Sequence, residues 1–382
     1  MANTITGLVP TLYEALDVVS RELVGFIPSV TLDSGVERAA VGQTVMSHVV
    51  PTSVASDLSP GVTAPNDGDQ VIGNVTLSIT KARGVPVRWN GEEQRGLNSG
   101  AGYGSIRVNQ FAQAMRTLVN EMETDTAIAA QVAASRAFGT AGTAPFATAG
   151  DYTQASNALK ILLDNGAPPS EMKMVISTAA GANLRGVQGG RGVNLEGSDS
   201  ILRQGVLLDI HGFEIRESAQ VVNVTKGTGT SYTSNTVGYA IGATSITLIT
   251  GSGTVLAGDV VTFAGDTNKY VVANGVSAPG VISLAAPGLI KALAASAVAM
   301  TIGDSYSANV AFNRSAIVLA TRAPALPEEG DMADDRLTVT DPRSGISFEV
   351  SLYKQYRQIR YEIAAAWGVK AVKSAHIATL MG

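Results

Sequence analysis

The spacing of apolar residues near the start of the chain predicts an amphipathic helix. Within residues 1–26 they recur every three or four positions, which is the period of an α-helix. The members of this stripe are Leu8, Leu12, Leu16, Val19 and Leu23. Pro10 suits a first helical turn, and Pro28 follows the expected end. Since no apolar partner lies nearby in sequence, we expect this helix to pack on a distant segment or on another chain.

A second and longer helical pattern covers residues 105–137. Its expected buried stripe consists of Ile106, Phe111, Met115, Leu118, Val119, Met122 and Ile128. Arg116, Glu121 and Glu123 are expected to lie off this stripe. At 1.5 Å per residue such a helix reaches roughly 50 Å, which exceeds the length of an ordinary globular helix.

Between the two helices the chain carries the signals of extended structure. Residues 41–50 are rich in valine and threonine, and a turn-rich piece, SPGVTAPNDGD, follows at 59–69. Residues 71–79 and 85–89 then read as strands, and the run ends at Asn90-Gly91, a turn signal. We therefore predict a long arm and a hairpin over residues 71–89. Because this stretch holds little core material, we expect it to project outward.

The middle and the end of the chain have the pattern of an α+β unit. The expected helices are 151–165 and 178–187, and the expected strands are 172–177, 206–210, 213–217, 316–320, 337–340, 346–352 and 358–367. His211-Gly212 is expected to form the turn between two of these strands.

Composition changes sharply at residue 226. From there to residue 303 the only charged residues are Lys226, Asp259, Asp266, Lys269 and Lys291. Short β runs alternate with turn signals in this stretch, at 245–249, 259–263, 270–272, 281–284 and 297–302. A spacing of roughly 8–12 residues between turns is typical of a small β-barrel or sandwich. We interpret 226–303 as an inserted domain.

Composition narrows the protein class. The chain has 382 residues, of which 15% are charged, and it contains no cysteine. A disulfide scaffold, a zinc–thiolate site and an iron–sulfur site are therefore excluded. A net charge of −5 argues against a basic surface over the whole protein. No apolar stretch reaches the ~20 residues of a membrane span, and the first residues lack the pattern of a secretion signal.

The inventory of catalytic residues is thin. The three histidines, His48, His211 and His376, show no metal-ligand spacing, and neither H-E-x-x-H nor G-x-S-x-G occurs. We therefore expect no catalytic residue, no cofactor and no metal site, and thus no enzyme.

Three weaker motifs have a functional and a structural interpretation. Gly100, Gly102 and Gly104 precede the long helix and would cradle a phosphate or form a hinge. Gly189-Gly190-Arg191 is either an anion loop or a surface loop. The acidic residues Glu328, Glu329, Asp331, Asp334 and Asp335 either bind a divalent cation or form a solvated loop.

Basic residues gather in two places. Lys81, Arg83 and Arg88 belong to the predicted hairpin, and Lys354, Arg357 and Arg360 lie near the C-terminal strands. Intersubunit salt bridges, a solvated face or phosphate contacts all account for them. The candidate intersubunit interface consists of Lys81, Arg83, Arg88, Trp89, Arg357 and Arg360.

The order of these parts resembles the major capsid proteins of tailed bacteriophages, whose fold is named after phage Hong Kong 97. The stretch 71–89 resembles the E-loop of that family, and the helix from Ser105 resembles its spine helix. ILRQGVLLDIHGFEIRESAQ at 201–220 and NVAFNRSAIVLATRAPALP at 309–327 resemble segments of its A-domain and its return strand. IAAAWGVKAVKSA at 363–375 resembles the coats of short-tailed phages, which carry an inserted β-barrel domain at a place comparable to 226–303.

The resemblance implies an α+β fold of the Hong Kong 97 type with an inserted small β-barrel domain. It divides the chain into an N-terminal helix and arm (1–43), an extended arm and E-loop (44–98), a spine helix and P-domain (99–150), a first part of the A-domain (151–225), the insertion (226–303) and a return through the A- and P-domains (304–382).

The same resemblance implies a function and a set of partners. The chain would self-assemble into hexamers and pentamers of an icosahedral shell around double-stranded DNA, which it would contact non-specifically. A separate scaffolding protein, a portal protein and, as an optional addition, a decoration protein would join it, with no membrane. It would be made in the host bacterial cytoplasm and end in the virion. Lys81 lies on the predicted hairpin, but no partner for a covalent crosslink can be assigned.

Two other functions remain open at this point. The Thr-, Gly- and Ala-rich insertion favours a secreted or surface β-rich adhesin, but the missing signal and the long helix argue against it. An enzyme built on residues 151–221 is the third alternative, and the absence of a catalytic constellation argues against it.

Overall fold

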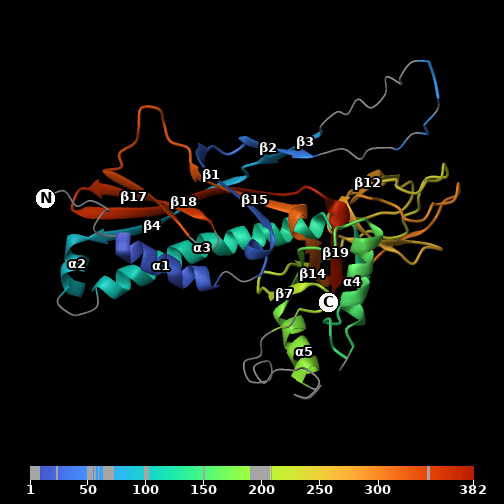
Figure 1. Ribbon diagram of the computed structural model, residues 1–382, viewed down its shortest axis with the longest axis horizontal. Helices are drawn as coiled ribbons and strands as arrows, with labels where there is room; N and C mark the ends of the chain where they lie inside the picture. The colour runs from blue at the N-terminus through green and yellow to red at the C-terminus, as the bar shows by residue number, and fades with distance from the viewer. Residues whose placement is uncertain are drawn as a thin grey trace.

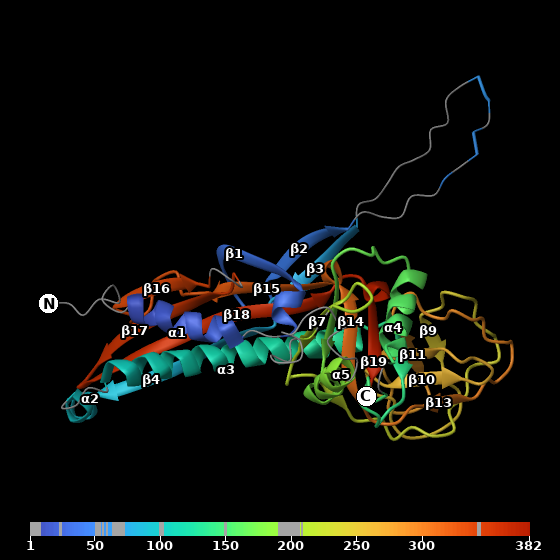
Figure 2. The ribbon, with the colours of Figure 1, turned by 60° about the horizontal axis from the view of Figure 1, so that its bottom comes forward.

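The computed structural model describes residues 9–22, 25–49, 55, 57–58, 60–62, 73–98, 103–148, 151–189, 207, 209–341 and 345–382. Its body is elongated, with helix α3 (Tyr103–Val132) running along it (Figures 1 and 2). One end holds a sheet covered by α1 and α3, and the other holds a second sheet with α4, α5 and the strands of residues 245–302.

The first sheet has six strands and is organised around its longest one. The strands are β1 (Thr31–Ala39), β4 (Lys81–Asn90), β15 (Ile317–Pro324), β16 (Asp335–Thr340), β17 (Ser347–Gln355) and β18 (Gln358–Ala371). One edge of β18 pairs with β4, and its other edge pairs first with β17 and then with β15. Strands β16 and β1 extend the sheet beyond β17 and β15, so β18 is the strand on which the other pairings depend.

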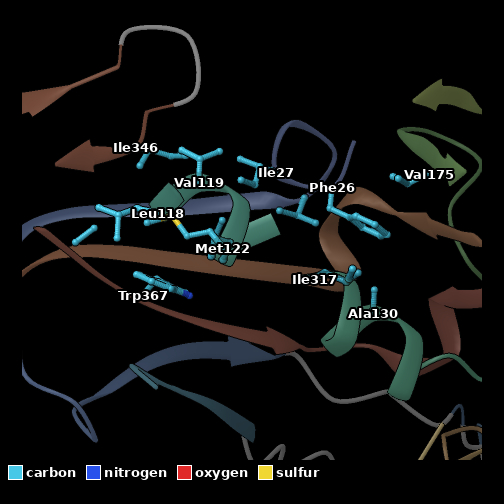
Figure 3. Close-up of a cluster of buried hydrophobic side chains, with 14 of the residues drawn as sticks. Phe26, Ile27, Leu118, Val119, Met122, Ala130, Val175, Ile317, Ile346 and Trp367 are labelled. Atoms are coloured by element: carbon cyan, nitrogen blue, oxygen red, sulfur yellow. The ribbon is translucent and has the colours of Figure 1, made fainter. Parts of the chain in front are cut away.

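Helices α1 (Val9–Glu22) and α3 supply the core for this sheet. Leu12, Ala15 and Leu16 of α1 are buried, and α1 packs on α3, which is the distant partner that its apolar stripe required. The α3 residues Leu118, Val119 and Met122 lie among Ile27, Ile346 and Trp367 from other segments (Figure 3). The apolar faces of two amphipathic helices thus close one side of the sheet.

Most of the buried stripe of α3 is as predicted, with three corrections. The helix ends at Val132 rather than at residue 137, because Arg136–Gly139 form a strand, β5. Ile128, expected inside, is 45% exposed, and Ala127 and Ala130 are buried instead. Glu123, expected off the stripe, is buried, because its carboxylate bonds to the backbone of another segment.

The second sheet has eleven strands, six of which lie outside residues 226–303. Its main path is β13, β10, β11, β5, β19, β14, β6 and β7. The strands outside residues 226–303 are β5 (Arg136–Gly139), β6 (Met172–Ile176), β7 (Glu214–Glu217), β8 (Asn223–Val224), β14 (Tyr306–Asn313) and β19 (Ile377–Met381). Helices α4 (Thr153–Asp164) and α5 (Thr178–Gly189) pack their apolar faces on it and bury a second cluster that includes Leu162, Met174 and Leu184.

Residues 226–303 contribute five strands near the predicted places. They are β9 (Ser245–Thr247), β10 (Val260–Phe263), β11 (Lys269–Asn274), β12 (Val281–Leu284) and β13 (Met300–Ile302). Most of their buried residues form a hydrophobic cluster of their own within positions 232–302, whereas Val260 and Val271 belong to the core cluster of the body. Strand β11 nevertheless pairs with β5, so the backbone of this region continues the second sheet. Its boundaries as a domain stay a prediction.

The predicted hairpin over residues 71–89 is wrong. Strand β3 (Gly73–Ser78) pairs with β2 (Thr44–Val49), whereas β4 pairs with β18. The predicted turn at Asn90-Gly91 is the start of helix α2 (Gly91–Asn98), where Asn90 and Glu93 exchange backbone-to-side-chain hydrogen bonds as a capping box. Alternation of apolar and polar residues predicts a strand, but it does not predict which strand pairs with it. Here β3 and β4, neighbours in sequence, join different sheets.

Two smaller expectations also change. The strand predicted for 206–210 is reduced, among the residues described there, to a single bridge between Ile210 and Phe213, although His211 and Gly212 form the predicted turn with φ of 51° and 81°. The return segment, predicted as one strand, forms β14 and β15 with a short 3₁₀ turn, Arg314–Ala316, between them.

A glycine in β18 marks the closest backbone approach at the base of β3. A Cβ on Gly368 would lie 2.1 Å from the Ser78 carbonyl oxygen. We expect Gly368→Ala to lower the free energy of unfolding by about 2 kcal/mol or more, because neither backbone can yield without breaking sheet pairing. The matched control is Gly96→Ala in α2, where a Cβ meets nothing within 4 Å. It should be neutral or stabilise by up to about 1 kcal/mol. Denaturant midpoints of the two variants would contradict this account if they were equal.

Candidate assembly surfaces

Strands β2 and β3 form a two-stranded arm that stands apart from both large sheets (Figures 1 and 2). The base of the arm is fastened by backbone bonds from Gly42 to Ile79 (2.8 Å) and from Thr80 to Trp367 (3.0 Å). Leu77 and Ile79 are buried there in a small cluster with Ala320 and Ala366. The arm is therefore held firmly at one end.

Apolar side chains lie exposed beyond the ladder of the arm. Leu58 and Val62, from the segment between β2 and β3, are 100% and 106% exposed. Two fully solvated branched side chains have an unfavourable hydration free energy that contact with another molecule would relieve. The arm is thus a surface that the single chain leaves uncovered.

Glu123 of α3 fastens the segment that leads from α1 to β1. Its carboxylate accepts the backbone N–H groups of Phe26 (2.7 Å) and Ile27 (2.9 Å) and the hydroxyl of Ser218 (2.9 Å). Burial raises the pKa of Glu123, and these three hydrogen bonds oppose that effect. Gly25 beside it has φ of +97°, and a Cβ there would lie 2.4 Å from the carboxylate. One buried acid therefore joins three segments that are distant in sequence.

The basic side chains of β4 are directed to the acids of α3. Lys81 Nζ lies 2.8 Å from Asp125 Oδ1, and Asp125 Oδ2 accepts the indole N–H of Trp367 at 2.8 Å. Arg83 pairs with Glu121 at 3.4 Å. Because these contacts run along one helix and two strands, they fix the position of β4 on α3 within the subunit.

Trp89, near the C-terminal end of β4, also contacts α3. It is 6% exposed, and its indole N–H donates to Gln110 Oε1 of α3 at 2.9 Å. Of the six candidate interface residues, Lys81, Arg83 and Trp89 therefore have partners on α3 within the chain, and their role between subunits stays a prediction.

The remaining three candidates lie close together although they are distant in sequence. Arg88 and Arg360 are register partners on β4 and β18, and Arg357 forms the tip of the β17–β18 hairpin with φ of 57°. Arg360 pairs with Glu362 and lies 5.9 Å from the ring centroid of Tyr353. A cavity of about 650 Å³ next to them is lined by Trp89, Lys354 and Arg357 among others. Arg88 of the first basic group thus lies on one surface with the second basic group, Lys354, Arg357 and Arg360, at this end of the sheet.

The acidic loop is a solvated, partly ion-paired segment. Asp331 pairs with Arg336 and accepts the hydroxyl of Tyr353 at 3.0 Å, and Asp334 pairs with Lys354 at 3.2 Å. Within the described ranges no group of three or more His, Asp or Glu residues is arranged to hold a metal ion.

The other candidate motifs of the sequence form no common site in the described part of the chain. His211 lies in a turn with its ring 6.5 Å from that of Tyr152, and His376 lies in a 3₁₀ turn, where burial lowers its pKa. The side chain of His48 lies outside the described residues, as do Gly100, Gly102, Gly190 and Arg191. Among the helices described here, none is long and apolar enough to cross a membrane.

Sequence reasoning missed the residues that hold the assembly surfaces in place. Glu123 is four positions after the buried Val119, a spacing that puts both on one face of the helix and was a usable signal. No sequence pattern pointed to Asp125. Its partners Lys81 and Trp367 lie on strands whose place in the fold the sequence did not predict.

Solved structures, rather than known sequences, show what this chain is similar to. No protein-family model and no curated protein matches the chain. Among solved structures, the capsid structure of the cyanophage P-SCSP1u is similar over 92% of this chain and 86% of that chain, with a TM-score of 0.50 and 12% identity. The chain has the α+β fold of this phage capsid structure, as predicted, whereas the inserted β-barrel stays a prediction.

Two further solved structures are also similar. A chain of Mycobacterium phage Che8 has a TM-score of 0.48 at 13% identity and covers 90% of this chain and 88% of its own. A virus-like particle from Pyrococcus furiosus has a TM-score of 0.45 at 10% identity, and the similarity covers 97% of this chain and 98% of that chain.

The bonds of Glu123 lead to a stability prediction. Glu123→Ala leaves two buried backbone N–H groups without an acceptor, so we expect the free energy of unfolding to fall by about 3 kcal/mol. Glu121→Ala, two positions away, breaks only the half-exposed pair with Arg83 and should cost less than about 1 kcal/mol. Equal denaturant midpoints for the two variants would show that Glu123 does not fasten this segment.

Proposed function

We propose that this chain is a major capsid protein that self-assembles into the shell of a tailed phage. The observation that carries the proposal is a capsid fold, shared over most of both chains, combined with an arm whose apolar residues find no cover in the subunit. A shell subunit must bury surface against several neighbours, and a projecting arm achieves this with few residues. Hexamers and pentamers closed by heterologous contacts would form an icosahedral shell around double-stranded DNA.

The proposal extends to the partners of the shell. A separate scaffolding protein, a portal protein and, as an optional addition, a decoration protein would take part in assembly. DNA would be contacted without sequence specificity, for which scattered basic groups suffice. The chain would act as a structural protein rather than an enzyme, be made in the bacterial cytoplasm, and reside in the virion.

The basic surface at the far end of the sheet is proposed as a second contact between subunits. Arg88 and Arg357 are exposed there, and Arg83 is 58% exposed despite its pair with Glu121. Exposed guanidinium groups suit bidentate contacts with carboxylates of a neighbour. Lys81 and Trp89 support this surface from within, through their contacts with α3.

The role of the arm is tested at its two exposed residues. The double variant Leu58→Ser and Val62→Ser should fold with an unchanged melting temperature, because neither side chain contacts the body of the subunit. Electron microscopy should nevertheless find few or no shells, since the apolar contact with a neighbour is lost. Val237→Ser, at a side chain that is 76% exposed in the insertion, is the matched control and should assemble normally.

Two results would count against the proposal. Normal shells from the double variant would refute the interface role of the arm. Monomers of the unchanged protein under all conditions, with no rings, shells or tubes, would argue against the capsid function itself.

Residues 226–303 are proposed to form an inserted domain. Their separate hydrophobic cluster supports this division, while the pairing of β11 with β5 and the bond from Gln131 to Gly258 (3.0 Å) attach the region to the body. An excised 226–303 fragment should give dispersed amide signals in an NMR spectrum, because most of its buried residues pack against one another rather than against the body. A collapsed spectrum would refute the boundary.

A further inference from the structure

A polar cavity lies where the inserted region meets the second sheet. It has a volume of about 590 Å³ and is bounded by β5, by the start of β11 and by one face of α4. Figure 2 shows α4 beside β11 at this end of the molecule. The size is that of a pocket for a small molecule.

The face of α4 that lines this cavity is polar. Gln154, Asn157 and Lys160 recur every three residues and line the cavity. Ala155, Ala158 and Leu162, on the other face, are buried in the core of the second sheet. The helix therefore packs its apolar face and turns two amides and an ammonium group toward the cavity.

The opposite wall carries a lysine without a counter-ion. Lys269 begins β11, and its ammonium donates to the carbonyl of Gly139 at 2.5 Å. Among the described residues no carboxylate lies within ion-pair distance of it. Partial burial lowers the pKa of Lys269, which reports the cost of holding this charge away from water. A half-buried cation with a single neutral partner retains unused donors.

The charges around the cavity favour an anion. Arg136, Lys160 and Lys269 line it, against the single lining carboxylate of Asp151. Asp151 is engaged with the backbone N–H of Thr153 at the start of α4, at 2.8 Å. Asp164 offsets part of the positive charge, since it lies 3.6 Å from Arg136 and 3.5 Å from Lys160. Lys269 is left as the uncompensated cation.

We propose that this cavity binds an oxyanion, with the ammonium groups of Lys269 and Lys160 as its direct contacts. The volume exceeds what a lone phosphate ion needs, and amides and threonine hydroxyls line the rest of the cavity. The ligand that fits best is therefore a small phosphate ester, whose organic part these neutral groups would contact. Free phosphate and carboxylates also present anionic oxygen acceptors to these ammonium groups.

The experiment is equilibrium titration calorimetry on the full chain at constant ionic strength. Inorganic phosphate, ribose 5-phosphate and succinate are the three probes. We expect saturable binding, tightest for ribose 5-phosphate. Lys269→Gln and Lys160→Gln should each weaken it by about tenfold, the effect of losing one hydrogen bond to a charged group. Lys160 is 70% exposed, so its variant should fold even if that of Lys269 does not.

The matched control is Lys291→Gln. Lys291 also donates to a backbone carbonyl, that of Gly265 at 2.6 Å, and it belongs to the same inserted region, but it does not line the cavity. Its variant should bind like the unchanged protein. Tightest binding of succinate would identify a carboxylate ligand at the same oxyanion site. No saturable binding of any probe, or an equal loss in Lys291→Gln, would overturn the proposal. Because binding rather than assembly is measured, the result is independent of the proposed capsid function.

Discussion

The packing of α3 between α1 and strand β18 is the contact on which the other parts of the subunit depend. Phe111 of α3 meets Tyr361 of β18 edge to face at 5.3 Å, and Met122 is fully buried beside Trp367 (Figure 3). Strand β18 in turn carries β4, β15 and β17. A helix of 30 residues spans about 45 Å, so one continuous element sets the length over which these contacts are made.

Two acidic side chains on α3, the buried Glu123 and the partly buried Asp125, make this contact specific. Glu123 bonds to the segment before β1, and Asp125 bonds to Lys81 and Trp367. Apolar packing alone tolerates sliding of a helix along a sheet, whereas a buried carboxylate without its donors is strongly unfavourable. The positions of the arm and of β4 are therefore fixed by polar contacts within an apolar layer. The arm can then carry exposed apolar residues at a fixed place relative to the body.

The region 226–303 packs partly as a separate unit and is partly joined to the body. Most of its core is made of its own residues. However, Val260 and Val271 pack in the core of the body, β11 extends the second sheet, and Gln131 at the end of α3 bonds to Gly258 and to Tyr306. The polar cavity lies along this junction, where two packed units meet without filling the space between them. Junctions of this kind are common places for small-molecule sites, because each unit satisfies its own core first.

By itself the sequence determined the local elements, because periodicity reports which face of a segment avoids water. The long helix, the strands of 226–303 and the α+β character followed from spacing alone, and the order of the parts identified the capsid fold. Only the tertiary structure decided the partners. Strand β4 joins β18 rather than β3, and Glu123 lies inside because of backbone N–H groups 96 and 97 residues away. Strand pairing and buried polar bonds link distant segments, and no local pattern encodes which segments meet.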